Sequence, residues 1–161
     1  MKILQIVESL HKGAVENWLV RIFIETQKHR SNWEWTFFCI IDAPGDLDNL
    51  VLENGGIIIK SRFAISNKIL FLKNLREQIR TNNYDIIHAH HDYLNSFYAM
   101  AFWRSRALKI SHIHNTDQHL PVGNRRLNTI LIPPLKLLNN ILFSKLIGIS
   151  QDTIKEFKYS F

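Results

Sequence analysis

Short apolar runs alternate with longer amphipathic segments along the whole chain. Most of these runs are continuous rather than alternating, which is typical of strands that are buried on both faces of a parallel sheet. The pattern predicts six strands, at Lys2–Val7, Thr36–Ile41, Gly56–Lys60, Asp85–Ala89, Lys109–His114 and Lys145–Ile149.

The segments between the runs have the periodicity of amphipathic helices. Ser66 and Ser150 are expected to cap helices, and Pro133-Pro134 is expected to bend or divide one. Regular alternation of strand and helix predicts an α/β fold with a parallel sheet and right-handed crossovers. The predicted helices are Val15–Lys28, Asp46–Glu53, Ser66 to about Arg80, Leu94–Arg104, Arg126–Phe143 and Ser150 to about Lys158.

Composition narrows the class of protein further. A length of 161 residues suits one domain. The formal charge of +6 favours an anionic partner such as nucleotide phosphate or anionic lipid, and plain solubility explains it equally well. The single cysteine, Cys39, lies in an apolar run, so we expect a buried core thiol in a reducing cytoplasm. No signal peptide is visible, and no apolar run reaches the ~18–20 residues that span a bilayer.

The turn after the first predicted strand has the features of an anion site. A helix that starts near Ala14 directs unpaired N–H groups and the positive end of its dipole at this turn. Gly13 lets an anion approach the backbone, Lys12 adds positive charge, and Glu16 in the first turn can accept hydrogen bonds from a hydroxylated ligand. A plain tight turn explains the same spacing. The full G-x-G-x-x-G pattern is missing, which disfavours a nicotinamide dinucleotide.

Histidines cluster at the carboxyl ends of two of the predicted strands. His88 and His90 share one face of the fourth strand, and His112 and His114 share one face of the fifth. If the two strands are neighbours, the imidazoles gather near the carboxyl edge of the sheet, where ligands bind. We expect hydrogen-bonded core roles for His88 and His112 and ligand contacts for His90 and His114. A metal site is the third interpretation, because His-x-His can chelate zinc but no companion cysteine or carboxylate set is evident.

Three further segments leave alternatives open. The loop Asn115–Arg125 is expected at the ligand face. A hydrolytic carboxylate pair of Asp92 and Asp117 is possible, but loop or capping roles are favoured for both. Arg126–Phe143 combines basic and apolar residues, which suits either a core helix with a basic rim or peripheral contact with an anionic membrane. Nucleic-acid binding is not supported, because the basic residues are scattered and no recognition motif is present.

Five segments together resemble a known family. They are Met1–Val7, Lys12–Asn17, Tyr84–His90, Ile110–Thr116 and Lys145–Ser150. Their order and spacing resemble the N-terminal domain of GT-B glycosyltransferases of the large family-4 group, with the closest similarity to enzymes of bacterial exopolysaccharide or capsule synthesis. The resemblance covers essentially the whole chain. It implies one of the two Rossmann-like domains of a GT-B fold, with the active site in the cleft between the domains.

The resemblance also implies roles for particular residues. The turn formed by Lys12, Gly13 and Ala14 would lie near the diphosphate of a nucleotide-sugar donor, and His114 would act catalytically beside the transferred sugar. His90, Glu16 and Asn115 would lie close to the cleft as substrate-binding residues. Family members of this type usually retain anomeric configuration, need neither metal nor separate cofactor, and use a glycan or lipid-linked acceptor.

Two departures from the family pattern affect these expectations. The family turn usually has two glycines, whereas Ala14 holds the second place here. The donor-binding basic pair and the Glu-x7-Glu element of the C-terminal domain have no counterpart in these 161 residues. We therefore expect residues 1–161 to be the acceptor-side domain, inactive in transfer by itself. The alternatives are a non-catalytic nucleotide- or glycan-binding module and one subunit of a split transferase.

Overall fold

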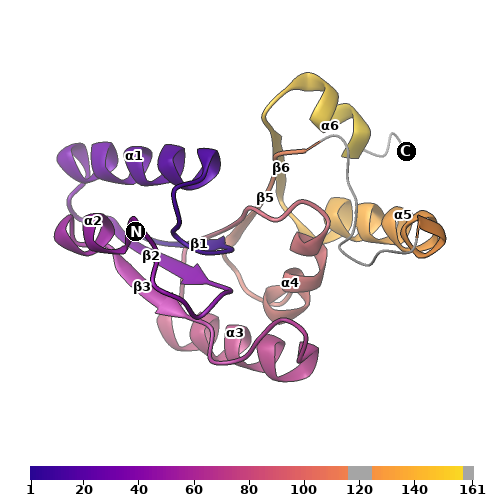
Figure 1. Cartoon of the computed structure of the whole chain (residues 1–161), viewed down its shortest axis with the longest axis horizontal. Coiled ribbons are helices and arrows are strands. Elements are labelled where there is room, and N and C mark those ends of the chain that lie inside the picture. The colour runs from indigo at the N-terminus through magenta and orange to yellow at the C-terminus, as the bar shows by residue number, and fades with distance from the viewer. Residues whose placement is uncertain (116–124, 158–161) are drawn as a thin grey trace.

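The computed structural model describes residues 1–115 and 125–157. Its described part contains a six-stranded, wholly parallel sheet with the order β3-β2-β1-β4-β5-β6 (Figure 1). The predicted Rossmann-like α/β fold is thereby confirmed. The strands are β1 (Lys2–Val7), β2 (Glu34–Cys39), β3 (Ile57–Lys60), β4 (Ile86–Ala89), β5 (Leu108–Ile113) and β6 (Lys145–Gly148).

Helices connect the strands in the predicted alternation. Asn67, not Ser66, precedes the third helix and accepts a hydrogen bond from the Leu70 N–H at 3.4 Å. Ser150 caps the last helix as predicted, since its Oγ accepts from the Thr153 N–H at 3.2 Å. The helices are α1 (Ala14–His29), α2 (Asp48–Glu53), α3 (Lys68–Asn82), α4 (Leu94–Phe102), α5 (Arg125–Leu142) and α6 (Gln151–Phe157).

The prolines do not divide α5, which runs through Pro133 and Pro134 as a single helix. Contacts on both sides of the prolines explain why it continues. Ile132 and Leu135 pack against a small buried cluster of Tyr93, Ile113 and Phe157. Ser96 of α4 also donates a hydrogen bond to the Leu135 carbonyl at 2.6 Å. No helix of the described residues is both long and apolar enough to cross a membrane.

Both faces of the sheet are covered, as the continuous apolar runs predicted. On β1, Leu4 and Ile6 enter the core formed with α3 and α4, while Ile3 and Val7 enter the core formed with α1 and α2 (Figure 1). Cys39 lies in the second core, and burial raises the pKa of its thiol to about 12. It is therefore a core side chain and not a nucleophile.

The strand order of the sheet reverses direction at β1. Strands β2 and β3 lie on one side of β1, and strands β4, β5 and β6 lie on the other. In open parallel sheets the crevice outside the carboxyl ends of the strands at such a reversal is where ligands bind. The turn after β1 and the histidines after β4 and β5 both lie at this edge.

Candidate functional site

Four histidines from β4 and β5 gather at the carboxyl edge of the sheet. The two strands pair in parallel with His88 opposite Ile110, so the predicted neighbourhood of the strands is confirmed. The ring centroids of His88 and His90 are 4.1 Å apart, and those of His112 and His114 are 4.3 Å apart. Across the strands, the His88–His112 and His90–His114 separations are 5.3 and 5.5 Å. The sequence therefore predicted this cluster correctly.

A chain of hydrogen bonds from Gln5 on β1 orients His114. His90 is 6% exposed, and its Nε2 lies 2.9 Å from Gln5 Oε1. Because the amide oxygen only accepts, this nitrogen carries the proton. The other nitrogen, Nδ1, then accepts from His114 Nε2 at 3.3 Å. His114 consequently has Nδ1 as its acceptor nitrogen. Gln5 was not predicted, although it is a single polar residue inside an apolar strand.

Burial keeps these imidazoles neutral. It lowers the pKa of His88 to about 3 and that of His112 to about 4, and it holds the pKa of His90 well below its usual value. The pKa of His114 is also lowered by burial, against an opposing effect of Asp92. At neutral pH the cluster therefore offers uncharged rings that can accept hydrogen bonds or coordinate a cation.

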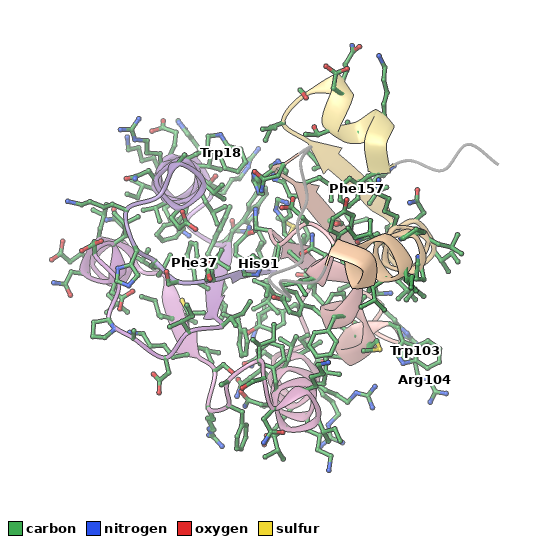
Figure 2. All side chains as sticks on the ribbon, turned by 45° about the vertical axis from the view of Figure 1, so that its right-hand side comes forward. Trp18, Phe37, His91, Trp103, Arg104 and Phe157 are labelled. Carbon is green, nitrogen blue, oxygen red and sulfur yellow. The ribbon has the colours of Figure 1, made fainter. Side chains whose placement is uncertain are left out.

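Two ring nitrogens of this cluster are buried and unpaired within the described part of the chain. His88 Nε2 and His112 Nδ1 are buried without a hydrogen bond to any described residue. Leaving such a group unpaired costs on the order of 1–3 kcal/mol. The expectation of core burial is met for His112, whereas His88 is only partly buried, and neither atom makes the expected hydrogen bond to a described residue. His112 also makes a T-shaped contact with Trp18, at 5.4 Å between ring centroids. Trp18 lies on α1 (Figure 2).

Asp92 fixes the positions of His114 and Asn115. Its Oδ1 accepts from the His114 backbone N–H at 2.7 Å, and its Oδ2 accepts from Asn115 Nδ2 at 2.9 Å. Its own φ of 48° lies in the left-handed region, which aspartate tolerates better than most residues. The predicted loop role of Asp92 is thus a positioning role for two candidate site residues. Its proposed partner, Asp117, and residues 116–124 of the predicted ligand-face loop lie outside the described residues.

The Asn95 side chain on α4 forms hydrogen bonds to both of the same two strands, β4 and β5. Its side chain is fully buried, and Nδ2 lies 3.1 Å from the Ala89 carbonyl oxygen and 2.8 Å from Ser111 Oγ. Its Oδ1 accepts from the His91 N–H at 2.8 Å. Sequence reasoning missed Asn95, because an asparagine at the start of a helix is ordinarily taken for a capping residue.

The turn after β1 leads into α1 as predicted. Gly13 is the N-cap residue and has an extended backbone, and no side chain caps the helix in its place. A Cβ built on Gly13 would collide with Glu16 Oε2, so the Glu16 carboxylate lies folded over the glycine. Ala14, which replaces the second family glycine, is the first residue of the helix.

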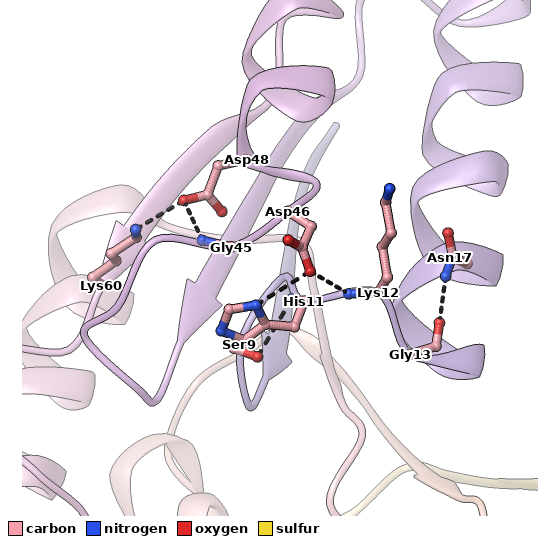
Figure 3. Close-up of polar contacts among 9 residues, drawn as sticks. All are labelled: Ser9, His11, Lys12, Gly13, Asn17, Gly45, Asp46, Asp48 and Lys60. Carbon is pink, nitrogen blue, oxygen red and sulfur yellow. Dashed lines mark hydrogen bonds and ion pairs between the residues drawn. The ribbon is translucent and has the colours of Figure 1, made fainter.

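Asp46 connects this turn to the loop before α2 (Figure 3). Its Oδ2 accepts from the Lys12 backbone N–H at 3.1 Å and lies 3.4 Å from His11 Nδ1. The Lys12 hydrogen bond and then the His11 contact lower the pKa of this carboxyl group. The sequence held no signal for Asp46, because it is 34 positions away from Lys12.

A groove of about 620 Å³ lies at the opposite edge of the sheet, near the amino ends of β4 and β5. Its walls include Arg76, Arg80, Arg104 and Arg106. Arg76 donates to the Ala101 and Met100 carbonyls, and Arg104 lies over the Trp103 ring (Figure 2). None of the candidate site residues predicted from the sequence lines this groove.

The chain matches one family profile and several solved structures. The sequence profile described as Glycosyltransferase Family 4 matches residues 29–158. A search of the curated proteins found no match. Among solved structures, Anabaena HepE in complex with UDP-glucose is 19% identical with a TM-score of 0.67, covering 98% of this chain and 40% of HepE.

Two other solved structures have the same fold. Acinetobacter baumannii MurG is 9% identical with a TM-score of 0.62, covering 99% of this chain and 43% of MurG. A Listeria monocytogenes protein described as a UDP-N-acetylglucosamine 2-epimerase is 11% identical with a TM-score of 0.63, covering 98% of this chain and 41% of that protein. At these identities the likeness shows the fold alone. This chain spans about 40% of the length of HepE.

Proposed function

This chain belongs to Glycosyltransferase Family 4, and we propose that it is the acceptor-side domain of an enzyme that transfers a sugar from a nucleotide-diphosphate-sugar to a glycan or lipid-linked acceptor, with retention of configuration. The predicted family is confirmed by the profile match over most of the chain. One observation carries the proposal for the site: the Gln5–His90–His114 chain holds a neutral imidazole at the sheet edge where ligands bind.

In this proposal His114 contacts the transferred sugar. Its Nδ1 is the acceptor nitrogen of a neutral ring, which suits a hydrogen bond from a sugar hydroxyl. Asp92 fixes the backbone at His114 and also the Asn115 amide, so both groups are presented in one orientation. Such preorganisation avoids the cost of ordering the site when substrate binds. His90 acts through His114, because it is almost fully buried.

The Lys12–Ala14 turn is proposed to lie beside the donor diphosphate. The N-terminal N–H groups of α1 and the dipole of this 16-residue helix stabilise negative charge. Departure of the nucleoside diphosphate would then be assisted electrostatically. The Glu16 carboxylate lies over Gly13 and repels an anion there. We therefore expect Glu16 to turn away when donor binds and to accept a hydrogen bond from a hydroxyl group of the ligand.

HepE, which shares the fold, has been crystallised with UDP and with UDP-glucose. This supports a nucleotide-sugar as the donor class here. We propose that a second domain supplies most of the donor contacts, and that residues 1–161 alone bind donor weakly and do not catalyse transfer.

The test is a His114→Ala substitution in a chain that also carries the donor-binding domain. We expect kcat to fall on the order of 10²–10³-fold, the effect of losing one oriented polar group in an active site. His29→Ala, an exposed histidine on α1, is the matched control and should retain wild-type turnover. Wild-type turnover in the His114→Ala enzyme, with the fold verified by circular dichroism, would exclude the role proposed for His114.

A further inference from the structure

The histidine cluster contains more nitrogen ligands than the proposed sugar contact uses. His88, His90 and His112 each place one ring nitrogen within 4.8 Å of the others. His88 Nε2 and His112 Nδ1 are also buried and have no hydrogen-bond partner among the described residues. Buried polar atoms of folded proteins nearly always have a partner. Six side-chain atoms of the described residues are exceptions, and these two belong to rings whose centroids are 5.3 Å apart.

The spacing of the rings fits a single metal ion. Three imidazoles around a tetrahedral zinc, with bonds of about 2.0–2.1 Å, have ring centroids about 5 Å apart. The His88–His112 and His90–His112 centroids are both 5.3 Å apart, and the His88–His90 centroids are 4.1 Å apart. Nitrogens bound to one such ion lie about 3.3 Å apart, so the rings must turn inward. This change requires rotation about the side-chain torsions of the three histidines.

The surroundings also suit a metal-bound imidazole. Histidines that bind a metal usually donate their second N–H to an oxygen that fixes the ring. Gln5 Oε1 is such an oxygen, 2.9 Å from His90 Nε2. Coordination requires neutral rings, and burial lowers the pKa of both His88 and His112 far below neutrality.

We propose that His88, His90 and His112 bind one zinc ion at the carboxyl edge of the sheet, linking β4 to β5. The donor set is all nitrogen, which suits zinc and its neighbours in the transition series and does not suit the oxygen-seeking ions magnesium and calcium. From the sequence, metal binding was the third interpretation of these histidines. The two unpartnered nitrogens now make metal binding the favoured interpretation for His88 and His112. Because His90 Nε2 stays bonded to Gln5, zinc takes His90 Nδ1 and replaces the hydrogen bond that this atom accepts from His114 Nε2. The sugar contact proposed above describes the zinc-free chain, and the zinc site is argued independently of it.

The test is direct metal titration of the chelator-treated chain. Zn²⁺ should bind with one ion per chain, and Co²⁺ should give the intense visible absorption of a four-coordinate site. His112→Gln should weaken Zn²⁺ binding by more than about 100-fold, because loss of an outer-shell partner alone costs 10–100-fold. His29→Gln is the matched control, since His29 and Glu25 form an exposed i,i+4 pair that can bind metal at the surface.

A second measurement does not depend on the folding of any variant. In ¹⁵N spectra of the wild-type histidine rings, Zn²⁺ should shift nitrogens of His88, His90 and His112 and leave His29 unchanged. Absence of stoichiometric binding, or binding that is lost in His29→Gln and kept in His112→Gln, would overturn the zinc site. Neither measurement reads sugar transfer, so failure of the zinc site would leave the proposed function to its own test.

Discussion

Replacement of Asp92 should show how much of the free energy of unfolding comes from the one side chain that holds His114 and Asn115 in place. Asp92→Ala removes two hydrogen bonds to a carboxylate, each of which contributes about 1.5–3 kcal/mol. Asp92 is only half-buried and Asn115 is exposed, so the low end of this range applies. Alanine also tolerates the φ of 48° poorly, at a cost of about 1 kcal/mol. We expect Asp92→Ala to lower the free energy of unfolding by about 4 kcal/mol.

Two matched variants separate these contributions. Asp92→Gly removes the hydrogen bonds but accepts the left-handed backbone, so it should lose only about 3 kcal/mol. Asp92→Asn keeps an oxygen for the His114 N–H and tolerates the backbone, so it should lose about 1 kcal/mol. Urea unfolding followed by circular dichroism, with unchanged m-values, gives all three numbers. The reasoning is refuted if glycine proves less stable than alanine, or if alanine and asparagine are equally stable.

Acid should destabilise the fold through its neutral histidines. The pKa values of about 3 for His88 and about 4 for His112 lie below that of an unfolded histidine, so the unfolded chain binds more protons and stability is lost as pH falls below about 6.5. Between pH 6.5 and 5 each of these two histidines should lower the free energy of unfolding by about 2 kcal/mol. A urea midpoint that does not change with pH would contradict this. Gly45→Ala should cost about 1–3 kcal/mol, because the new Cβ would lie 2.7 Å from the Leu10 backbone. Gly13→Ala meets only the flexible Glu16 side chain and should be nearly neutral, so equal melting temperatures for the two variants would show the packing argument to be wrong.

The strands were predictable because burial on both faces leaves a continuous apolar run. The predicted bounds of β2 were wrong at both ends, since the strand is Glu34–Cys39 rather than Thr36–Ile41. At its start, Glu34 is polar and half-buried, so it did not extend the apolar run. The histidine cluster was also predictable, since it needs only a period of two and adjacent strands. For α5 the division at Pro133-Pro134 that the local rule allows did not occur, because packing against Tyr93 and Phe157 holds the helix together beyond the prolines.

The side-chain pairs that orient the site were not predictable. Gln5 and His90 are 85 positions apart, and their contact depends on the register between β1 and β4. The same holds for Asp46 and Lys12, which come from different loops. A single sequence shows which residue types stand at strand ends, but it does not show which distant partner each side chain meets.

The central place of β1 has a consequence for synthesis of the chain. This strand is made before the other five strands of the sheet, yet one of its two neighbours, β4, begins at Ile86, about 80 residues later. At about 5–20 residues per second, a ribosome needs about 4–16 s to cover that distance. During this interval β1 has an unpaired edge and an incomplete apolar covering, the features that make nascent strands prone to aggregate. The middle of the finished sheet is therefore an aggregation-prone segment of the nascent chain until β4 has been made.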